Sequence, residues 1–150
     1  DANMGDPHPA IIQYPPGSRM SYSSVGYTIL QLLIEDMTNR PFNEYMKEQV
    51  LQPLGIKYAS YDTEELASQG RLNELAPNYD RELKTHPHRK HTMMAGGSLR
   101  ITPHEMALFL QAYFQEKLLT KSTIQLMLQP QPATASSWAL GHEIYLDTAS

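Results

Sequence analysis

The sequence of 150 residues contains no cysteine, which excludes disulfide bonds and thiolate metal sites without selecting a cellular compartment. It also lacks any run close to the roughly 18 apolar residues of a membrane-spanning helix, because Gln31 interrupts the longest apolar stretch, 29–34. Basic residues are few, since 12 Lys and Arg stand against 16 Asp and Glu, for a net charge of −4. Nucleic-acid binding needs a clustered excess of positive charge. We therefore expect no membrane span and no nucleic-acid partner.

The beginning of the sequence is acidic and polar over residues 1–6 and does not resemble a signal peptide. We therefore expect residues 1–150 to be an internal piece of a longer chain, a single partial domain. An apolar fraction of 41% and a charged fraction of 19% are those of an ordinary globular protein. The sequence contains no internal repeat and no low-complexity tract.

Proline and glycine are abundant in residues 1–21, which predicts an extended arm that ends in a turn. From Ser24 onward, apolar residues recur every four positions, and this spacing predicts a helix that buries one face. The expected inner face consists of Val25, Ile29, Leu30, Leu33, Ile34 and Met37. Asn39 is a suitable stop, because asparagine tolerates left-handed backbone geometry. Pro41 suits the first turn of a second helix, which ends at 53–55.

The second half of the sequence is less evenly patterned. Residues 56–95 are polar, with a short helix predicted at 64–68, and such a stretch is expected to be a functional loop or to be held by a partner. Thr102-Pro103-His104-Glu105 then predicts a helix start, in which the threonine caps a backbone N–H and the glutamate reaches back to the cap. This helix is expected to run to about residue 117, followed by a short helix at 123–128 and a strand at 137–146. The predicted fold is mainly α.

Tyr22 is the first candidate for chemistry. The turn at Pro16-Gly17 brings this residue to the entrance of the predicted helix, where the positive end of the helix favours a phenolate. A tyrosine in this position is more often a packing residue than a catalytic one. Residue type and position alone therefore assign no role to Tyr22.

Four segments in order and in similar spacing carry a resemblance to one family. They are Pro16-Gly17 with Tyr22-Ser23-Ser24 and Gly26-Tyr27, then Phe42–Tyr45 with Pro53–Ile56, then Ala95–Leu99 with Thr102–Ala107, and last Trp138–Gly141. Together they resemble the class C β-lactamase, DD-peptidase and esterase family of penicillin-recognising serine hydrolases. The resemblance covers most of the chain.

The resemblance implies the helical subdomain of a β-lactamase/transpeptidase-like α+β serine hydrolase, with a C-terminal strand segment. It implies that Tyr22 acts as general base toward a nucleophilic serine and then as acid toward the leaving group. Since a free phenol has a pKa near ~10, neighbouring lysine ammonium groups must assist. The resemblance also implies substrate contacts from Ser24, Gly96, Gly97 and Ser98, because the family's glycine pair lies near the active serine. It implies a small-molecule acyl substrate and no cofactor or metal.

Three departures from the family pattern modify this expectation. No serine has a lysine three residues later, so the nucleophile motif Ser-x-x-Lys is absent, and so is the late Lys-Thr-Gly or His-x-Gly element. Ser24 stands where the family has asparagine, and a hydroxyl offers one donor where a carboxamide offers two donors and an acceptor. We therefore expect the isolated chain to be inactive and leave the substrate open between ester, peptide and lactam.

The departures also imply partners and alternatives. The remainder of the parent chain, a sheet domain, is expected to dock on the helical part, and its absence favours self-association. One alternative is a stand-alone helical binding module, which would fold alone without a large exposed apolar patch. The other is a decayed pseudoenzyme, an interpretation that Ser24 keeps open. The family resemblance implies a bacterial protein in an exported or periplasmic location.

His86, His88 and His91 form a histidine-rich segment that is a candidate metal site. Two of these residues flank a proline in one loop, and no carboxylate partner is evident from the sequence. We therefore predict a solvated loop and no metal site.

Overall fold

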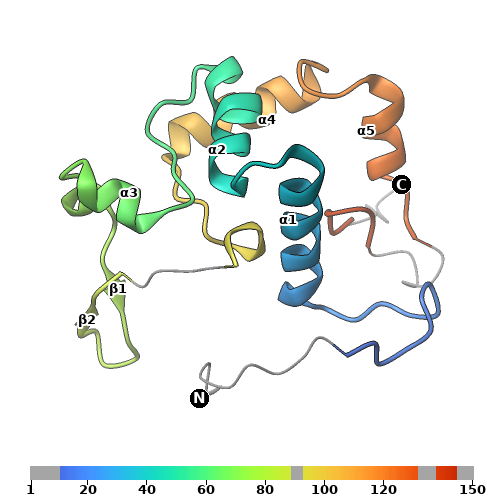
Figure 1. The fold of residues 1–150 in the computed structure, drawn as a ribbon, viewed down its shortest axis with the longest axis horizontal. Coiled ribbons are helices and arrows are strands. Elements are labelled where there is room, and N and C mark those ends of the chain that lie inside the picture. The colour runs from blue at the N-terminus through green and yellow to red at the C-terminus, as the bar shows by residue number, and fades with distance from the viewer. Residues whose placement is uncertain (1–10, 89–92, 132–137, 145–150) are drawn as a thin grey trace, which may run out of the picture. The chain divides into compact units, whose positions relative to one another are not determined.

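The computed structural model describes residues 11–88, 93–131 and 138–144. The chain divides into two compact units, one formed by Ser23–Leu119 and the other by Asp1–Tyr22 with Thr120–Ser150 (Figure 1). Helices account for most of the regular structure, and the sheet found among the described residues has two strands. The mainly α fold predicted from the sequence is confirmed.

Helix α1 (Ser24–Thr38) begins and ends where the sequence predicts. The Ser23 side chain caps it by accepting a hydrogen bond from the backbone N–H of Gly26 at 3.2 Å. Asn39 ends it in the left-handed conformation, with φ of 52°. Local capping chemistry therefore fixes both ends of α1.

A second helical segment follows Pro41, as predicted, but it changes its hydrogen-bond pattern along its length. It consists of α2 (Phe42–Met46), the π-helical turn η1 (Lys47–Leu51) and the 3₁₀ turn η2 (Gln52–Leu54). Gly55 ends the segment with φ of 72°, which glycine adopts without a steric penalty. Phe42 and Leu51 are buried, and the Phe42 ring packs edge-on against Tyr61 at 5.2 Å.

The polar stretch after Gly55 contains more regular structure than the predicted short helix alone. Its elements are α3 (Thr63–Ser68), η3 (Leu72–Glu74), β1 (Asn78–Tyr79), β2 (Thr85–His86) and η4 (Met94–Gly96). The two strands are antiparallel, with Asn78 opposite His86. The Asp80 carboxylate holds their turn, because its Oδ1 accepts from the backbone N–H groups of Glu82 and Lys84 at 2.8 and 2.9 Å.

Helix α4 (Pro103–Phe114) has the predicted cap but not the predicted return contact. The Thr102 hydroxyl accepts from the backbone N–H of Glu105 at 3.2 Å, as expected. The Glu105 side chain does not turn back to the cap. Its Oε1 instead accepts from the backbone N–H groups of Lys57 and Tyr58, at 2.7 and 2.9 Å. The prediction of a reciprocal capping box was wrong, because two unpaired donors from a distant loop compete for the same carboxylate.

The other unit contains α5 (Lys121–Met127), which starts at a Thr120 cap. In residues 138–144, Trp138 and Glu143 form an antiparallel bridge about a turn at Gly141, where φ is 78°. The remainder of the predicted strand 137–146 lies outside the described residues. Among the residues that the structure describes, none of the helices combines the length and apolar content required to cross a bilayer.

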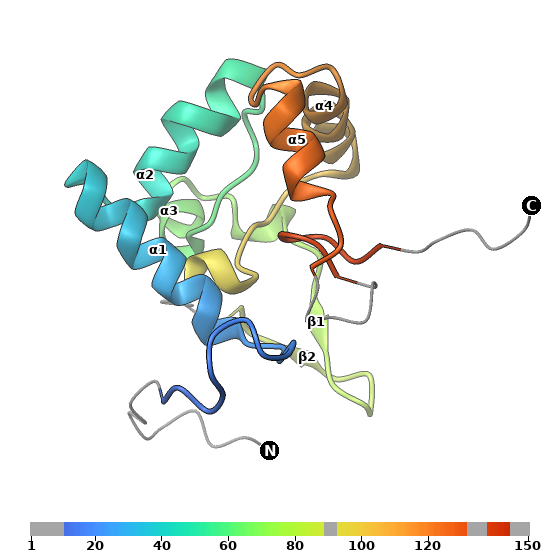
Figure 2. The ribbon, with the colours of Figure 1, turned by 90° about the vertical axis from the view of Figure 1, so that its right-hand side faces the viewer.

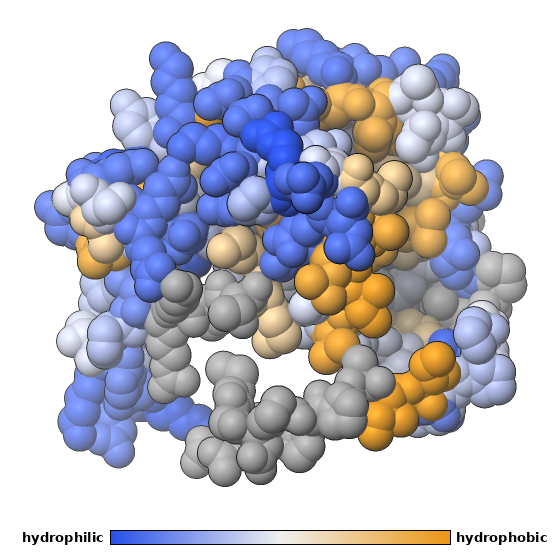
Figure 3. All heavy atoms as spheres, viewed as in Figure 1, coloured by the Kyte–Doolittle hydropathy of each residue, from blue (hydrophilic) through white to orange (hydrophobic). Residues whose placement is uncertain are grey.

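Burial on α1 is the reverse of the prediction. The expected inner face is largely exposed, with Val25 at 44%, Ile29 at 55% and Met37 at 78% exposure. Figure 3 shows apolar side chains gathered where α1 lies in the view of Figure 1. The buried residue of α1 is Gln31, at 7% exposure. The opposite stripe of the helix, in heptad-like spacing, consists of Ser24, Thr28, Gln31, Glu35 and Thr38. We call the exposed residues Val25, Ile29, Leu30, Leu33 and Met37 the outer face of α1.

Candidate functional site

The approach to α1 is a turn, as the sequence predicts. The backbone N–H of Ser18 donates to the Pro15 carbonyl at 3.1 Å, and Gly17 adopts a φ of 74°. The Arg19 guanidinium lies 3.5 Å from the centre of the Tyr14 ring, a cation–π contact within the same arm. Tyr22 follows and directly precedes the Ser23 cap, with 79% of its surface exposed. An exposed phenol at this position is available to an incoming group, so its predicted catalytic role stays a prediction.

Ser24 and Gly96, two of the predicted substrate contacts, lie against each other. Helix α1 packs on the η4 turn, and Figures 1 and 2 both show the coil of η4 beside α1. A Cβ atom placed on Gly96 would lie 3.5 Å from the Ser24 carbonyl oxygen and 3.7 Å from its Cβ. These are ordinary contact distances, so the two predicted motifs meet by close backbone approach.

Gln31 holds the η4 turn onto α1. Its Oε1 accepts from the backbone N–H of Ala95 at 3.2 Å, and its Nε2 donates to Glu35 Oε1 at 3.3 Å. The same Glu35 oxygen accepts from the backbone N–H of Phe42 at 3.0 Å. One buried amide and one carboxylate therefore join α1, α2 and η4, and they position Gly96 against Ser24.

Gly97 and Ser98, the other predicted substrate contacts, complete the turn. Gly97 has a φ of 138°, a conformation that strains any residue with a Cβ. Ser98 is buried at 3% exposure, and its hydroxyl donates to the Met93 carbonyl at 3.5 Å. Substrate contact by these two residues stays a prediction.

The histidine-rich segment has a carboxylate partner that the sequence did not reveal. His86 Nε2 lies 3.1 Å from Asp80 Oδ2, and His88 Nδ1 lies 3.2 Å from the Asn78 amide. The pKa of Asp80 is lowered, chiefly by the backbone hydrogen bond from Lys84, with a further contribution from His86. His91 lies outside the described residues, within which no group of three metal-ligating side chains occurs.

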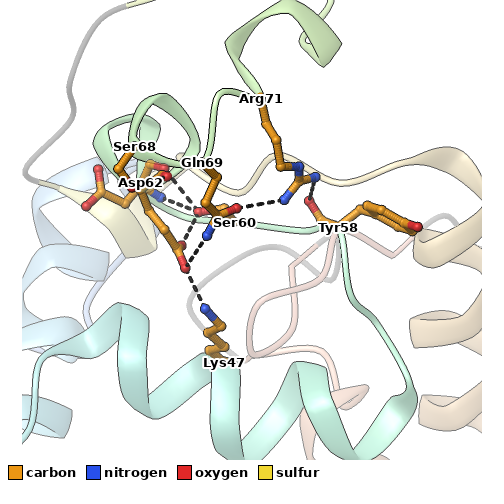
Figure 4. A network of polar contacts seen from close by, with 8 residues as sticks. Lys47, Tyr58, Ser60, Asp62, Ser68, Gln69 and Arg71 are labelled. Carbon is orange, nitrogen blue, oxygen red and sulfur yellow. Dashed lines mark hydrogen bonds and ion pairs between the residues drawn. The ribbon is translucent and has the colours of Figure 1, made fainter.

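A network of polar side chains links α3, η1 and the loop before α3 (Figure 4). Ser60 is buried, and its hydroxyl donates to Glu65 Oε2 at 2.7 Å, while Lys47 forms an ion pair with the other oxygen of Glu65. Burial alone would raise the pKa of Glu65, but the hydrogen bonds from Lys47 and Ser60 outweigh it, and the pKa is lowered. The backbone of Ser60 also pairs with Arg100 in both directions, at 2.9 and 2.8 Å. We call Lys47, Ser60 and Glu65 the Ser60 network.

The order of these motifs matches that of a known family. The family model of the beta-lactamases matches residues 8–147 of this chain, which is most of its length. The chain belongs to the beta-lactamase family. A putative D-alanyl-D-alanine carboxypeptidase of Escherichia coli (strain K12) is 33% identical over 51 residues, which are 34% of this chain and 12% of that protein. The corresponding protein of Salmonella newport (strain SL254) is 37% identical over 51 residues, again 12% of its length.

Solved structures agree with the fold assignment. The octameric penicillin-binding protein homologue from Pyrococcus abyssi is similar over 79% of this chain and 27% of its own, with 27% identity and a TM-score of 0.66. The D-amino acid amidase from Ochrobactrum anthropi SV3 matches 77% of this chain and 35% of its own, with 26% identity and a TM-score of 0.66. A penicillin-binding protein from Bacillus halodurans, 21% identical with a TM-score of 0.72 over 88% of this chain and 42% of its own, supports the fold alone. The chain thus spans well under two thirds of the length of each of these relatives.

Sequence reasoning missed two residues that shape the site. Gln31 interrupts an apolar stretch, but its spacing to Ser24 and Glu35 also places all three on one stripe of the helix. For Glu105, the local sequence predicts only a cap. Its actual partners, Lys57 and Tyr58, lie far away in sequence, so the local pattern carried no signal for them.

Proposed function

We propose that this chain is the helical part of a serine hydrolase that transfers an acyl group to water through an acyl-enzyme. The observation that supports it best is the contact between Ser24 and Gly96, which joins two family motifs far apart in sequence at the start of α1. Family membership over residues 8–147 supports the same conclusion. The catalytic residue that this chain supplies is Tyr22, which is exposed directly before the Ser23 cap.

In the proposed reaction, a serine from another part of the protein attacks the substrate carbonyl carbon. The Tyr22 oxygen accepts the proton of that serine and then gives it to the leaving amine or alcohol as the carbonyl–leaving-group bond breaks. Water then attacks the ester carbonyl while the same phenolate takes its proton, and the resulting phenol returns that proton to the serine oxygen as the bond to the acid breaks. The N-terminus of α1 and a lysine beside the serine would stabilise the phenolate.

The described activities of similar proteins support a substrate class. Similar proteins are described as a putative D-alanyl-D-alanine carboxypeptidase and as a D-amino acid amidase. We therefore favour an amide bond adjacent to a D-amino acid over an ester or a lactam.

We further propose that the outer face of α1 packs against the remainder of the hydrolase, a sheet domain. Matched solved chains are much longer than this one, which covers 27% to 42% of their lengths. A continuous apolar stripe on a helix whose polar stripe is already packed supports a missing neighbour. The exposed apolar stripe supports the docking of a sheet domain over a stand-alone binding module, because a module that folds alone would not expose a large apolar patch.

The test uses the longer coding sequence that contains these residues, in which a Ser-x-x-Lys motif should precede Asp1. Hydrolysis of D-alanyl peptides, nitrophenyl esters and a chromogenic cephalosporin would be compared for Tyr22→Phe and wild type. The proposal predicts a loss in kcat/KM of about 10²- to 10⁴-fold for Tyr22→Phe. The matched control Tyr27→Phe, on α1 and half-exposed, should stay within about twofold. An unchanged rate in Tyr22→Phe would exclude the proposed role.

A further inference from the structure

An open cavity of about 710 Å³ lies within the Ser23–Leu119 unit. This volume is within the range of about 300–1,000 Å³ typical of small-molecule sites. Its apolar wall is provided by Leu66, Leu75, Leu99 and Ile101, and Tyr58 adds an aromatic ring. Two arginines, Arg71 and Arg100, bring positive charge to the same cavity.

The two arginines differ in how many of their guanidinium N–H groups already donate hydrogen bonds. Each guanidinium nitrogen of Arg71 has a partner: it pairs with Glu74 at 2.9 Å and donates to the Gln69 amide oxygen and the Tyr58 carbonyl, both at 3.1 Å. Figure 4 shows its guanidinium directed at Tyr58 and Gln69. Arg71 is therefore a structural wall whose charge is neutralised by Glu74.

Arg100 keeps unused donors. Within the described residues its guanidinium donates only to the Ser98 carbonyl, at 2.6 Å, and no carboxylate lies within ion-pairing distance. Its backbone is fixed by the two hydrogen bonds to buried Ser60. A planar guanidinium on a rigid backbone presents a fork that matches a carboxylate.

We propose that this cavity binds a small organic acid, with the carboxylate on Arg100 and an apolar or aromatic group against Leu99, Leu75 and Tyr58. Of the two arginines that line the cavity, Arg100 is the one without a carboxylate partner among the described residues, so its charge favours an anionic group, and the apolar wall favours an acid that carries a hydrophobic body. Gly97 borders the cavity, while its neighbour Gly96 faces Ser24. The proposal does not depend on the catalytic role of Tyr22.

The experiment titrates the 150-residue chain with hippurate, a carboxylate attached to an aromatic amide, and follows backbone amide signals by NMR. Hippurate should bind and shift the signals of Leu75, Leu99 and Ile101. Hippuramide, which has the same shape without the charge, should bind at least about tenfold more weakly. Absence of binding up to about 10 mM hippurate would overturn the proposal.

Variants locate the contact. Arg100→Gln should weaken hippurate binding at least about tenfold, whereas Arg81→Gln, an exposed arginine outside the cavity, should leave it unchanged. Should Arg100→Gln fail to fold, Ala76→Trp provides a second test, because it fills the cavity from an exposed position and should also abolish binding. Equal affinity for hippurate and hippuramide, or full binding in both variants, would show that the acid does not bind at this site.

Discussion

Helix α1 and the Ser60 network belong to the same unit, but they differ in how well their side chains are covered by the rest of that unit. In the network, buried Ser60 and its carboxylate neighbour Glu65 find their partners among described residues. On α1 the polar stripe is satisfied by η4 and α2, while the outer face has about half or more of its surface exposed at most positions. Within the described residues, the polar side chains around Ser60 therefore have partners inside this unit, whereas the outer face of α1 is exposed. Ser24 begins α1 on the polar stripe, and Tyr22 precedes the Ser23 cap in the sequence.

The largest effect should come from the carboxylate that ties α4 to the loop before the network. Glu105→Ala removes the acceptor for two backbone N–H groups and should cost about 3 kcal/mol in the free energy of unfolding. Urea unfolding followed by circular dichroism measures this loss. Glu105→Gln keeps an oxygen that can accept from both N–H groups but loses the charge, and it should therefore cost less than Glu105→Ala. A loss below about 0.5 kcal/mol in the free energy of unfolding for Glu105→Ala would show that these two hydrogen bonds do not stabilise the unit.

A smaller loss in the free energy of unfolding is expected when the contact between Gln31 and the η4 turn is removed. Gln31→Ala leaves the Ala95 N–H without its acceptor and should cost about 1–2 kcal/mol. Amide hydrogen exchange should rise at Ala95 and Gly96, since the η4 turn loses its hold on the helix. Gln49→Ala, an exposed glutamine in η1, is the matched control and should change stability by less than about 0.5 kcal/mol. Unchanged exchange at Ala95 would contradict the assigned contact.

The sequence was sufficient for features set by neighbours along the chain. Ser23, Asn39 and Thr102 end or begin helices because their side chains or backbone preferences act within one turn. The sequence was not sufficient to determine which stripe of α1 is buried. An apolar stripe predicts that some neighbour covers it, but not that the neighbour lies within these residues.

The candidate site shows the same division between local features, which the sequence predicts, and tertiary contacts, which it does not. The sequence placed Tyr22 correctly at the entrance of α1, but it did not predict the η4 turn that contains Gly96. Gln31, which holds the η4 turn on α1, accepts from Ala95, 64 residues away in the sequence, and Glu35 accepts from Phe42 in the next helix. Such contacts depend on the tertiary arrangement, and a single sequence contains no local pattern for them.

A still smaller and pH-dependent effect is expected in the Ser60 network. Because the pKa of Glu65 is lowered on folding, its contribution is present above the unfolded pKa of about 4.3 and is lost as the pH falls through the lower folded value. Glu65→Gln should therefore be less stable than wild type near neutral pH, by at most about 1 kcal/mol because Lys47 is half-exposed. The difference should shrink toward about pH 3.

The check is a pair of urea titrations, one near neutral pH and one in acid. Lys47→Met should also reduce the stability difference between neutral and acid pH, because it removes one of the three side-chain donors, Lys47, Ser60 and Gln69, that lower the pKa of Glu65. Equal stability differences at both pH values would mean that the Glu65 contacts contribute nothing that depends on its charge.

The most direct test concerns the outer face of α1, where the smallest change in stability is expected. In the 150-residue chain, Ile29→Lys and Leu33→Lys should alter the free energy of unfolding by less than about 0.5 kcal/mol, since both side chains are half-exposed. Binding of an apolar dye should fall at the same time. Leu66→Ala, at a residue with 2% exposure, should cost about 2–5 kcal/mol as the buried reference. A loss in Ile29→Lys as large as that in Leu66→Ala would contradict the account, because the outer face would then already be covered.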